Sequence, residues 1–136
     1  MGAAKMPVTE EWFNTEHTIM LTTYTPQWTW DEVWESFERG VKMTKNLDYQ
    51  VDSIVDLSQA TAPPPIGTLR QGKKFADSAN PQRGMTVLVK ANRWIKAMTK
   101  VFFFFFPASA AQFPFEFADT VAEAEAILSQ RRERCP

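Results

Sequence analysis

Hydrophobic residues along this chain follow two spacings, one typical of β-strands and one typical of α-helices. Short apolar runs, most of them rich in β-branched residues, predict strands at residues 11–14, 18–24, 51–57, 84–90 and 113–117. Pro114 lies inside the last run, so we expect that strand to be at an edge of the sheet or only to begin there.

Helical spacing separates these runs. The first predicted helix begins at Thr29, because Glu32 follows at the spacing of a capping box. Its apolar residues fall at intervals of three and four: Trp30, Val33, Trp34, Phe37 and Val41. This aromatic stripe could form a ligand box, but we favour a core face packed against a sheet. Further helices are predicted over residues 65–76, from 92 to before Pro107, and from Thr120, where Glu123 repeats the capping-box spacing.

The predicted element order is ββαβαβαβα. Strands that alternate with helices require crossover connections, so the sheet should be mostly parallel, with the first hairpin adding an antiparallel edge. We therefore expect an α/β fold with a five-stranded mixed sheet and four helices. The domain should cover residues 9–134, after a loose arm at residues 1–8 and with a turn at Asn80–Pro81.

Charge and composition exclude several classes of function. The chain of 136 residues has 15 Lys and Arg against 16 Asp and Glu, a net charge of -1 that argues against nucleic-acid binding. Cys135 is the single cysteine and His17 is the single histidine. The chain therefore has too few of these residues for an internal disulfide, a Cys/His metal site or a histidine dyad. We expect no metal, no cofactor and no enzymatic activity.

The location of the protein follows from what the chain lacks. The first residues contain no apolar run of signal-peptide length. The longest apolar run, residues 101–108, is far too short to cross a bilayer. We expect a cytoplasmic protein without an integral membrane segment.

Several local motifs resemble the STAS domain, the anti-sigma-factor antagonist fold, and more closely its SpoIIAA-like group of bacterial proteins. The motifs are the strand VDSIVDLS at residues 51–58, Gly67 and Leu69 at the second helix, VKANR at 89–93 and FADT at 117–120. The resemblance covers roughly residues 10–130 and implies a STAS-like single domain that binds a protein partner in regulation.

The phosphorylation switch of that family does not carry over. Phosphorylated STAS proteins have an Asp-Ser pair just before the glycine of the second helix, and this chain has Pro64 and Pro65 there. Ser58 and Thr68 are nearby hydroxyls, but neither matches the motif. Partner binding without phosphorylation remains an expectation.

A ligand rim is predicted where the parallel strands end, because open α/β sheets bind ligands beyond the carboxyl ends of their strands. The residues that follow these ends are Tyr24, Thr25, Trp28, Asp56, Ser58, Asn92 and Arg93. Arg93 could hold an anion at a helix N-terminus. The alternative is that this set serves only as helix caps, loop hydrogen bonds and an Asp–Arg pair. An enzyme that uses Asp56 and Arg93 is the least favoured hypothesis, because no nucleophile–base pair accompanies them.

Five consecutive phenylalanines, residues 102–106, end the third predicted helix. On a helical wheel one side gathers Trp94, Ile95, Met98, Val101, Phe102, Phe105 and Phe106. Phe103 and Phe104 fall beside Lys96 and Lys100 and should be partly exposed. Three explanations stay open: cover by residues 108–112 and the last helix, a self-association surface, or a site for a lipid or other apolar ligand.

These features predict a non-enzymatic interaction module that forms homodimers, with Phe103, Phe104 and Phe106 at or near the interface. The alternative is a carrier or sensor of a lipid or other apolar small molecule, which the aromatic content and the similarity of STAS-like folds to lipid-binding CRAL-TRIO domains favour.

Overall fold

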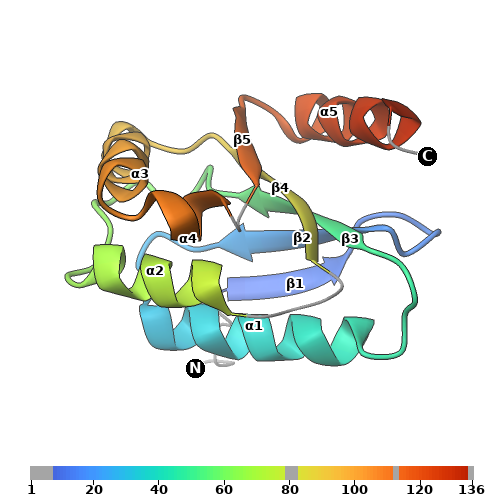
Figure 1. The fold of residues 1–136 in the computed structure, drawn as a ribbon, viewed down its shortest axis with the longest axis horizontal. Helices are drawn as coiled ribbons and strands as arrows, with labels where there is room; N and C mark the ends of the chain where they lie inside the picture. The colour runs from blue at the N-terminus through green and yellow to red at the C-terminus, as the bar shows by residue number, and fades with distance from the viewer. Residues whose placement is uncertain (1–7, 79–82, 112–113, 135–136) are drawn as a thin grey trace, which may run out of the picture.

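The computed structural model of the chain describes residues 8–78, 83–111 and 114–134 (Figure 1). Most of the expected arm, the turn at Asn80–Pro81, Phe113 and Cys135 lie outside the described residues. Val8 was expected to end the arm, but it begins the first strand and is almost fully buried.

Five strands form one sheet in the order of the sequence. They are β1 (Val8–Trp12), β2 (Ile19–Tyr24), β3 (Val51–Asp56), β4 (Arg83–Val89) and β5 (Phe115–Ala118). β1 pairs with β2 antiparallel, and the other pairs are parallel. The expected α/β class and the five-stranded mixed sheet are therefore confirmed.

The described residues form five helices where four were expected. They are α1 (Trp30–Thr44), α2 (Thr68–Asp77), α3 (Arg93–Phe105), α4 (Pro107–Ala111) and α5 (Val121–Arg134). α4 lies between α3 and β5, where no helix was expected. The backbone at Phe106 leaves the helical region, and Pro107 then begins a new helix, a position where its missing N–H has no cost.

Two element boundaries differ from the sequence prediction for local reasons. β1 ends at Trp12, because the Asn14 side chain accepts hydrogen bonds from the backbone N–H of Thr18 (3.0 Å) and of Ile19 (3.2 Å) and closes the turn. α2 begins only at Thr68, because Gly67 has φ 88°, a left-handed conformation that glycine adopts readily.

The predicted helix starts are well formed. Thr29 and Glu32 make both hydrogen bonds of the capping box of α1. At α5 the Thr120 hydroxyl accepts from the backbone N–H of Glu123 at 3.0 Å, which is the first of the two bonds expected there. Local sequence therefore fixes where these two helices begin.

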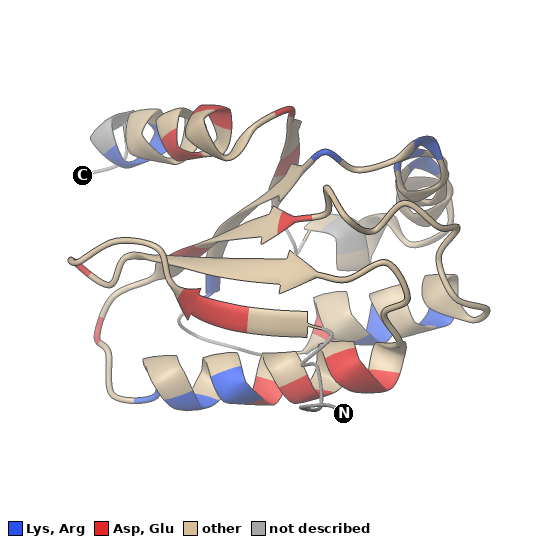
Figure 2. Cartoon of the chain, turned by 180° about the vertical axis from the view of Figure 1, so that it is seen from behind, with Lys and Arg blue, Asp and Glu red and all other residues tan. Residues whose placement is uncertain are grey.

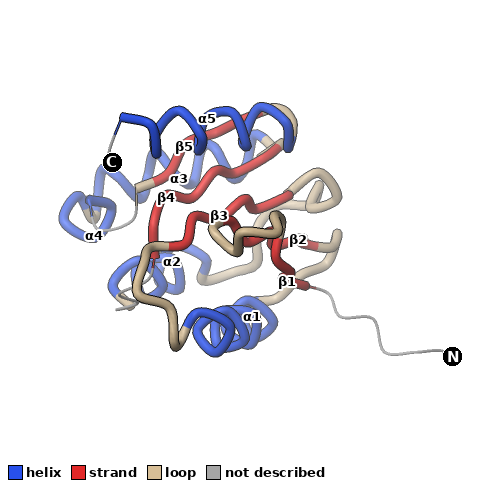
Figure 3. The backbone as a smooth tube through the Cα atoms, turned by 90° about the vertical axis from the view of Figure 1, so that its right-hand side faces the viewer, coloured by secondary structure: helices blue, strands red, loops and turns tan. Residues whose placement is uncertain are grey.

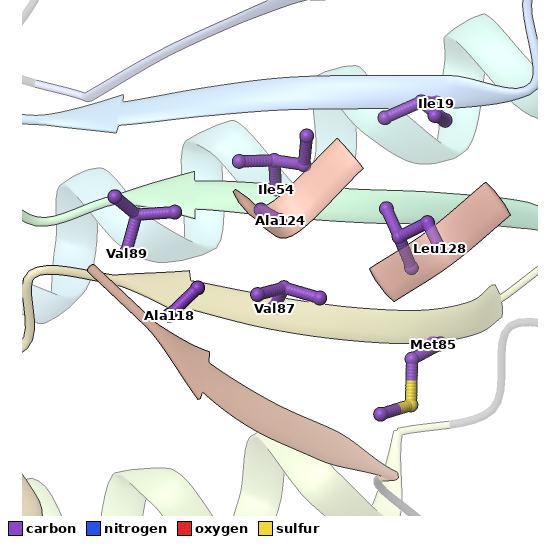
Figure 4. Packing of buried hydrophobic residues seen from close by; sticks show 8 residues of the cluster. All are labelled: Ile19, Ile54, Met85, Val87, Val89, Ala118, Ala124 and Leu128. Atoms are coloured by element: carbon purple, nitrogen blue, oxygen red, sulfur yellow. The ribbon is translucent and has the colours of Figure 1, made fainter. Parts of the chain in front are cut away.

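Helices cover both faces of the sheet, with α5 on one side and α1 and α2 on the other (Figure 3). The core under α5 is formed mainly by aliphatic residues that are almost fully buried (Figure 4). Ala124 and Leu128 of α5 pack on Ile54 and Val87, and all four are 0% exposed. This face is a conventional core.

A buried ion pair fastens α5 to the sheet. The Asp52 side chain is 1% exposed, and its carboxylate accepts from Arg132 Nε at 2.8 Å and from the backbone N–H of Met85 at 2.8 Å. Arg132 also donates to the carbonyls of Thr18 (3.1 Å) and Gln50 (2.9 Å). A Cβ on Gly84 would clash with the Asp52 carboxylate, which explains the glycine there.

Candidate functional site

The opposite face of the sheet is only partly filled by a second core, which contains the buried residues Val8, Trp28, Val33 and Leu57. A cavity of about 290 Å³ lies between the strands and helices α1, α2 and α3. Its lining is mostly apolar, and it includes much of the aromatic stripe of α1. This stripe was predicted to pack against a sheet. In the structure part of it packs in the core, and part of it lines the cavity.

The cavity exists because small residues face one another across it. The strands contribute Thr22, Ser53 and Thr86 to its floor, beside the apolar residues Met20, Val51, Val55 and Leu88. The helices contribute Ser36, Gly40, Thr44, Gly72 and Thr99. A Cβ added at Gly72 would have nothing within 4 Å, so this position opens directly onto free space.

The roof over the cavity is held together by polar and aromatic contacts between α1 and α2. Trp30 Nε1 donates to Thr68 Oγ1 at 3.0 Å, and Trp34 Nε1 donates to Gln71 Oε1 at 2.9 Å. The Phe75 ring lies 5.3 Å from that of Phe37, in an edge-on contact. These cross-links keep α1 and α2 from collapsing onto the small residues of the floor.

Charged groups at the cavity wall are already paired. Glu10 is nearly fully buried, and its carboxylate accepts from Ser36 Oγ and from Arg39 Nε. Arg83 donates to the carbonyls of Phe75 (3.3 Å) and Ala76 (3.0 Å), and burial lowers the pKa of its guanidinium. Burial raises the pKa of the Tyr24 phenol, and the Glu10 carboxylate adds to the rise.

The residues of the expected rim do lie at one edge of the sheet, where several of them have structural partners. Asp56 Oδ1 accepts from the backbone N–H of Ser58 at 2.9 Å. Asn92 caps α3 by accepting from the N–H of Ile95 (2.9 Å), and it donates to two carbonyls of the loop after β3, at 2.8 and 3.1 Å. Capping and loop hydrogen bonds thus account for these three residues.

The remaining rim residues divide between the interior and the surface. Tyr24 and Trp28 line the cavity and touch edge to face, with ring centroids 5.1 Å apart. Thr25 is half-buried. Arg93 is exposed and lies over the Trp94 ring at 5.1 Å, and within the described part of the chain it makes no ion pair with Asp56.

α3 closes the cavity with one face and exposes the other. Ile95, Met98, Thr99 and Phe102 line the cavity. Phe103 and Phe104 are 46% and 79% exposed, in agreement with the wheel. Trp94, Val101 and Phe105 were assigned to the inner side, and that was wrong, because they are 47%, 39% and 61% exposed.

The environment of Phe106 differs from that of the exposed rings. Its ring lies 5.8 Å from the Phe102 ring, and the Lys73 ammonium of α2 is 5.7 Å from its centroid. Phe106 is therefore half-buried between α3 and α2, while the exposed rings are those of Phe103, Phe104 and Phe105. Phe103 is partly covered by Phe115, stacked at 5.3 Å.

α3 is also basic. It contains Arg93, Lys96 and Lys100 and no acidic residue, as Figure 2 shows. Cations and exposed aromatic rings therefore share its outer side. No described helix has both the length and the apolar character that a membrane crossing requires.

Sequence patterns missed the cavity because each lining residue is ordinary by itself. The available signal was the set of Ser, Thr and Gly residues at inward positions of β2, β3, β4, α1 and α2. No family model matches the chain, and no curated protein and no solved structure matches it either.

Proposed function

We propose that this protein is a non-enzymatic carrier or sensor that binds an apolar small molecule in the cavity between the sheet and helices α1, α2 and α3. One observation carries the proposal: the cavity of about 290 Å³ with a mostly apolar lining. That volume is at the lower end of the range of small-molecule sites, which are mostly apolar and concave.

The energetics favour an occupant. The cavity is partly open to solvent, so an apolar ligand that enters it displaces water. The apolar surface that the ligand and the lining then bury is worth about 25 cal/mol per Å². A ligand that fills the space recovers contacts that the small floor residues give up.

A fluorescence titration with N-phenylnaphthylamine tests this function. We expect the dye to brighten on binding with an affinity in the micromolar range. Gly72→Leu should weaken binding about tenfold or more, because its side chain enters the cavity and its higher helix propensity should not harm α2. The control is Lys74→Leu, which places the same leucine side chain at an exposed position of α2.

The result has clear alternatives. Equal dye binding by the wild type, Gly72→Leu and Lys74→Leu would place the dye outside the cavity and refute the proposal. Absence of dye binding by a folded wild type would do the same. Native mass spectrometry of freshly purified protein supplies a second readout, since a retained molecule adds mass to the chain.

A second candidate function is self-association through α3. The observation that favours it is the exposure of three neighbouring rings, Phe103, Phe104 and Phe105. Burying a Phe side chain is worth about 1.5–3 kcal/mol, and a second copy of the chain could provide that burial. This surface is separate from the cavity, so a homodimer is compatible with ligand binding.

Membership of the STAS-like group and a cytoplasmic location complete the proposal. The observed sheet with its antiparallel first hairpin supports the first. In this chain the position of the family's Asp-Ser pair is Pro64 and Pro65, and the nearby Thr68 hydroxyl accepts from Trp30 Nε1 and donates to the Pro65 carbonyl. Regulation by phosphorylation is therefore not part of the proposal.

A further inference from the structure

Hydroxyl groups line the cavity on both the helix side and the strand side, and the two sets differ in their hydrogen bonding. On the helices, Ser36 donates to Glu10, Thr44 to the Gly40 carbonyl at 3.0 Å, and Thr99 to the Ile95 carbonyl at 2.8 Å. The helix hydroxyls are therefore satisfied inside the protein. They need nothing from a ligand.

The strand hydroxyls have no such partners. In the parts of the chain that the structure describes, the side-chain hydroxyls of Thr22, Tyr24, Ser53 and Thr86 make no hydrogen bond. All four residues line the cavity, and Thr86 is only 4% exposed. Among the described residues no fully buried polar side-chain atom lacks a partner, so these hydroxyls remain in contact with solvent in the cavity. A ligand that fills the cavity has to replace the hydrogen bonds that they make to water.

The register places two of these groups side by side. Ser53 on β3 pairs with Thr86 on β4, so their side chains are direct neighbours on the same face. Thr22 on β2 pairs with Val55, and Tyr24 lies two residues further along, so their hydroxyls are further from this pair. The described part of the floor therefore presents one adjacent pair of free hydroxyls, Ser53 and Thr86.

We infer that the ligand is a neutral, mainly apolar molecule that carries a hydroxyl or carbonyl group, and that this oxygen binds at the Ser53–Thr86 pair. A pure hydrocarbon would cover these hydroxyls without replacing the hydrogen bonds they make to water, which is unfavourable. A charged ligand fits less well, because Glu10 is paired with Arg39 and the guanidinium of Arg83 is bonded to carbonyls at the end of α2. This inference rests on the proposed function and specifies its ligand class.

Displacement of N-phenylnaphthylamine by three matched molecules tests the inference: tetralin, tetralol and tetralin carboxylate. The wild type should bind tetralol about tenfold more tightly than tetralin, and the carboxylate most weakly. Thr86→Val and Ser53→Ala should bring the tetralol-to-tetralin ratio close to one, while tetralin binding stays equal or improves. Thr99→Val is the control, because its hydroxyl also lines the cavity but is already bonded, and its ratio should not change.

The outcomes separate the two proposals. If the dye binds in the cavity but tetralin and tetralol compete equally, the ligand class is wrong and the carrier function stands. A preference for the carboxylate would also overturn the inference. If neither the dye nor any of the three molecules binds, the proposed function itself fails. Circular dichroism of each variant distinguishes a lost contact from a lost fold.

Discussion

Tyr24 shows how one residue reports on the cavity. Burial, assisted by the Glu10 carboxylate, raises the pKa of its phenol above the ordinary value near 10. The neutral phenol is therefore favoured in the folded state, where its ring also packs against Trp28. Sequence placed Tyr24 correctly at the end of a strand but gave no sign of the buried carboxylate beside it.

This shift predicts that stability falls with alkaline pH. Above about pH 10 the unfolded chain loses the Tyr24 proton while the folded chain keeps it, so the free energy of unfolding decreases as pH rises. Urea denaturation at a series of alkaline pH values measures the slope. Tyr24→Phe should flatten it, and Tyr49→Phe, which removes an exposed tyrosine, should not. An unchanged slope in Tyr24→Phe would contradict the assignment.

The sequence predicts best the helices and strands whose boundaries are set by neighbouring residues. The capping box at Thr29 and the apolar run of β3 depend on neighbouring residues, and the start of α1 and both ends of β3 were predicted within a residue. α4 and the Asp52–Arg132 pair were missed for a common reason. A short helix after Pro107 has almost no periodic signal, and the paired residues are 80 positions apart.

At the scale of α3, exposure of the rings predicts self-association. Sedimentation velocity at tens of micromolar should detect a dimer in the wild type, and Phe104→Asp should leave a monomer, because a charge replaces the most exposed of the rings. Ala126→Asp is the control, because it places the same charge at an exposed position of a different helix, α5.

A monomeric wild type would contradict the homodimer. Binding of that monomer to anionic lipid vesicles, lost in Phe104→Asp, would instead assign the surface to lipid headgroups, which Arg93, Lys96 and Lys100 would attract.

At the scale of the whole molecule, the two faces of the sheet follow different designs. Beneath α5, the inward residues of β3 and β4 are Ile54, Met85, Val87 and Val89, and the core is closed. Beneath α1 and α2 the same strands present Ser53 and Thr86 beside Val55 and Leu88, and a cavity remains. Alternation along the strands predicts which residues share a face of the sheet. The volume of the cavity also depends on how far the bulky residues of α1 and α2 hold these helices from the sheet, and the sequence pattern does not give that distance.

The central claim is that this cavity holds a small oxygen-bearing apolar molecule, and a crystal soaked with tetralol tests it most directly. The account predicts electron density for the ring system between Gly72 and the floor, with its hydroxyl within hydrogen-bond distance of Ser53 or Thr86. A cavity that stays free of the ring system, or one closed by movement of α1 and α2 onto the sheet, would contradict it.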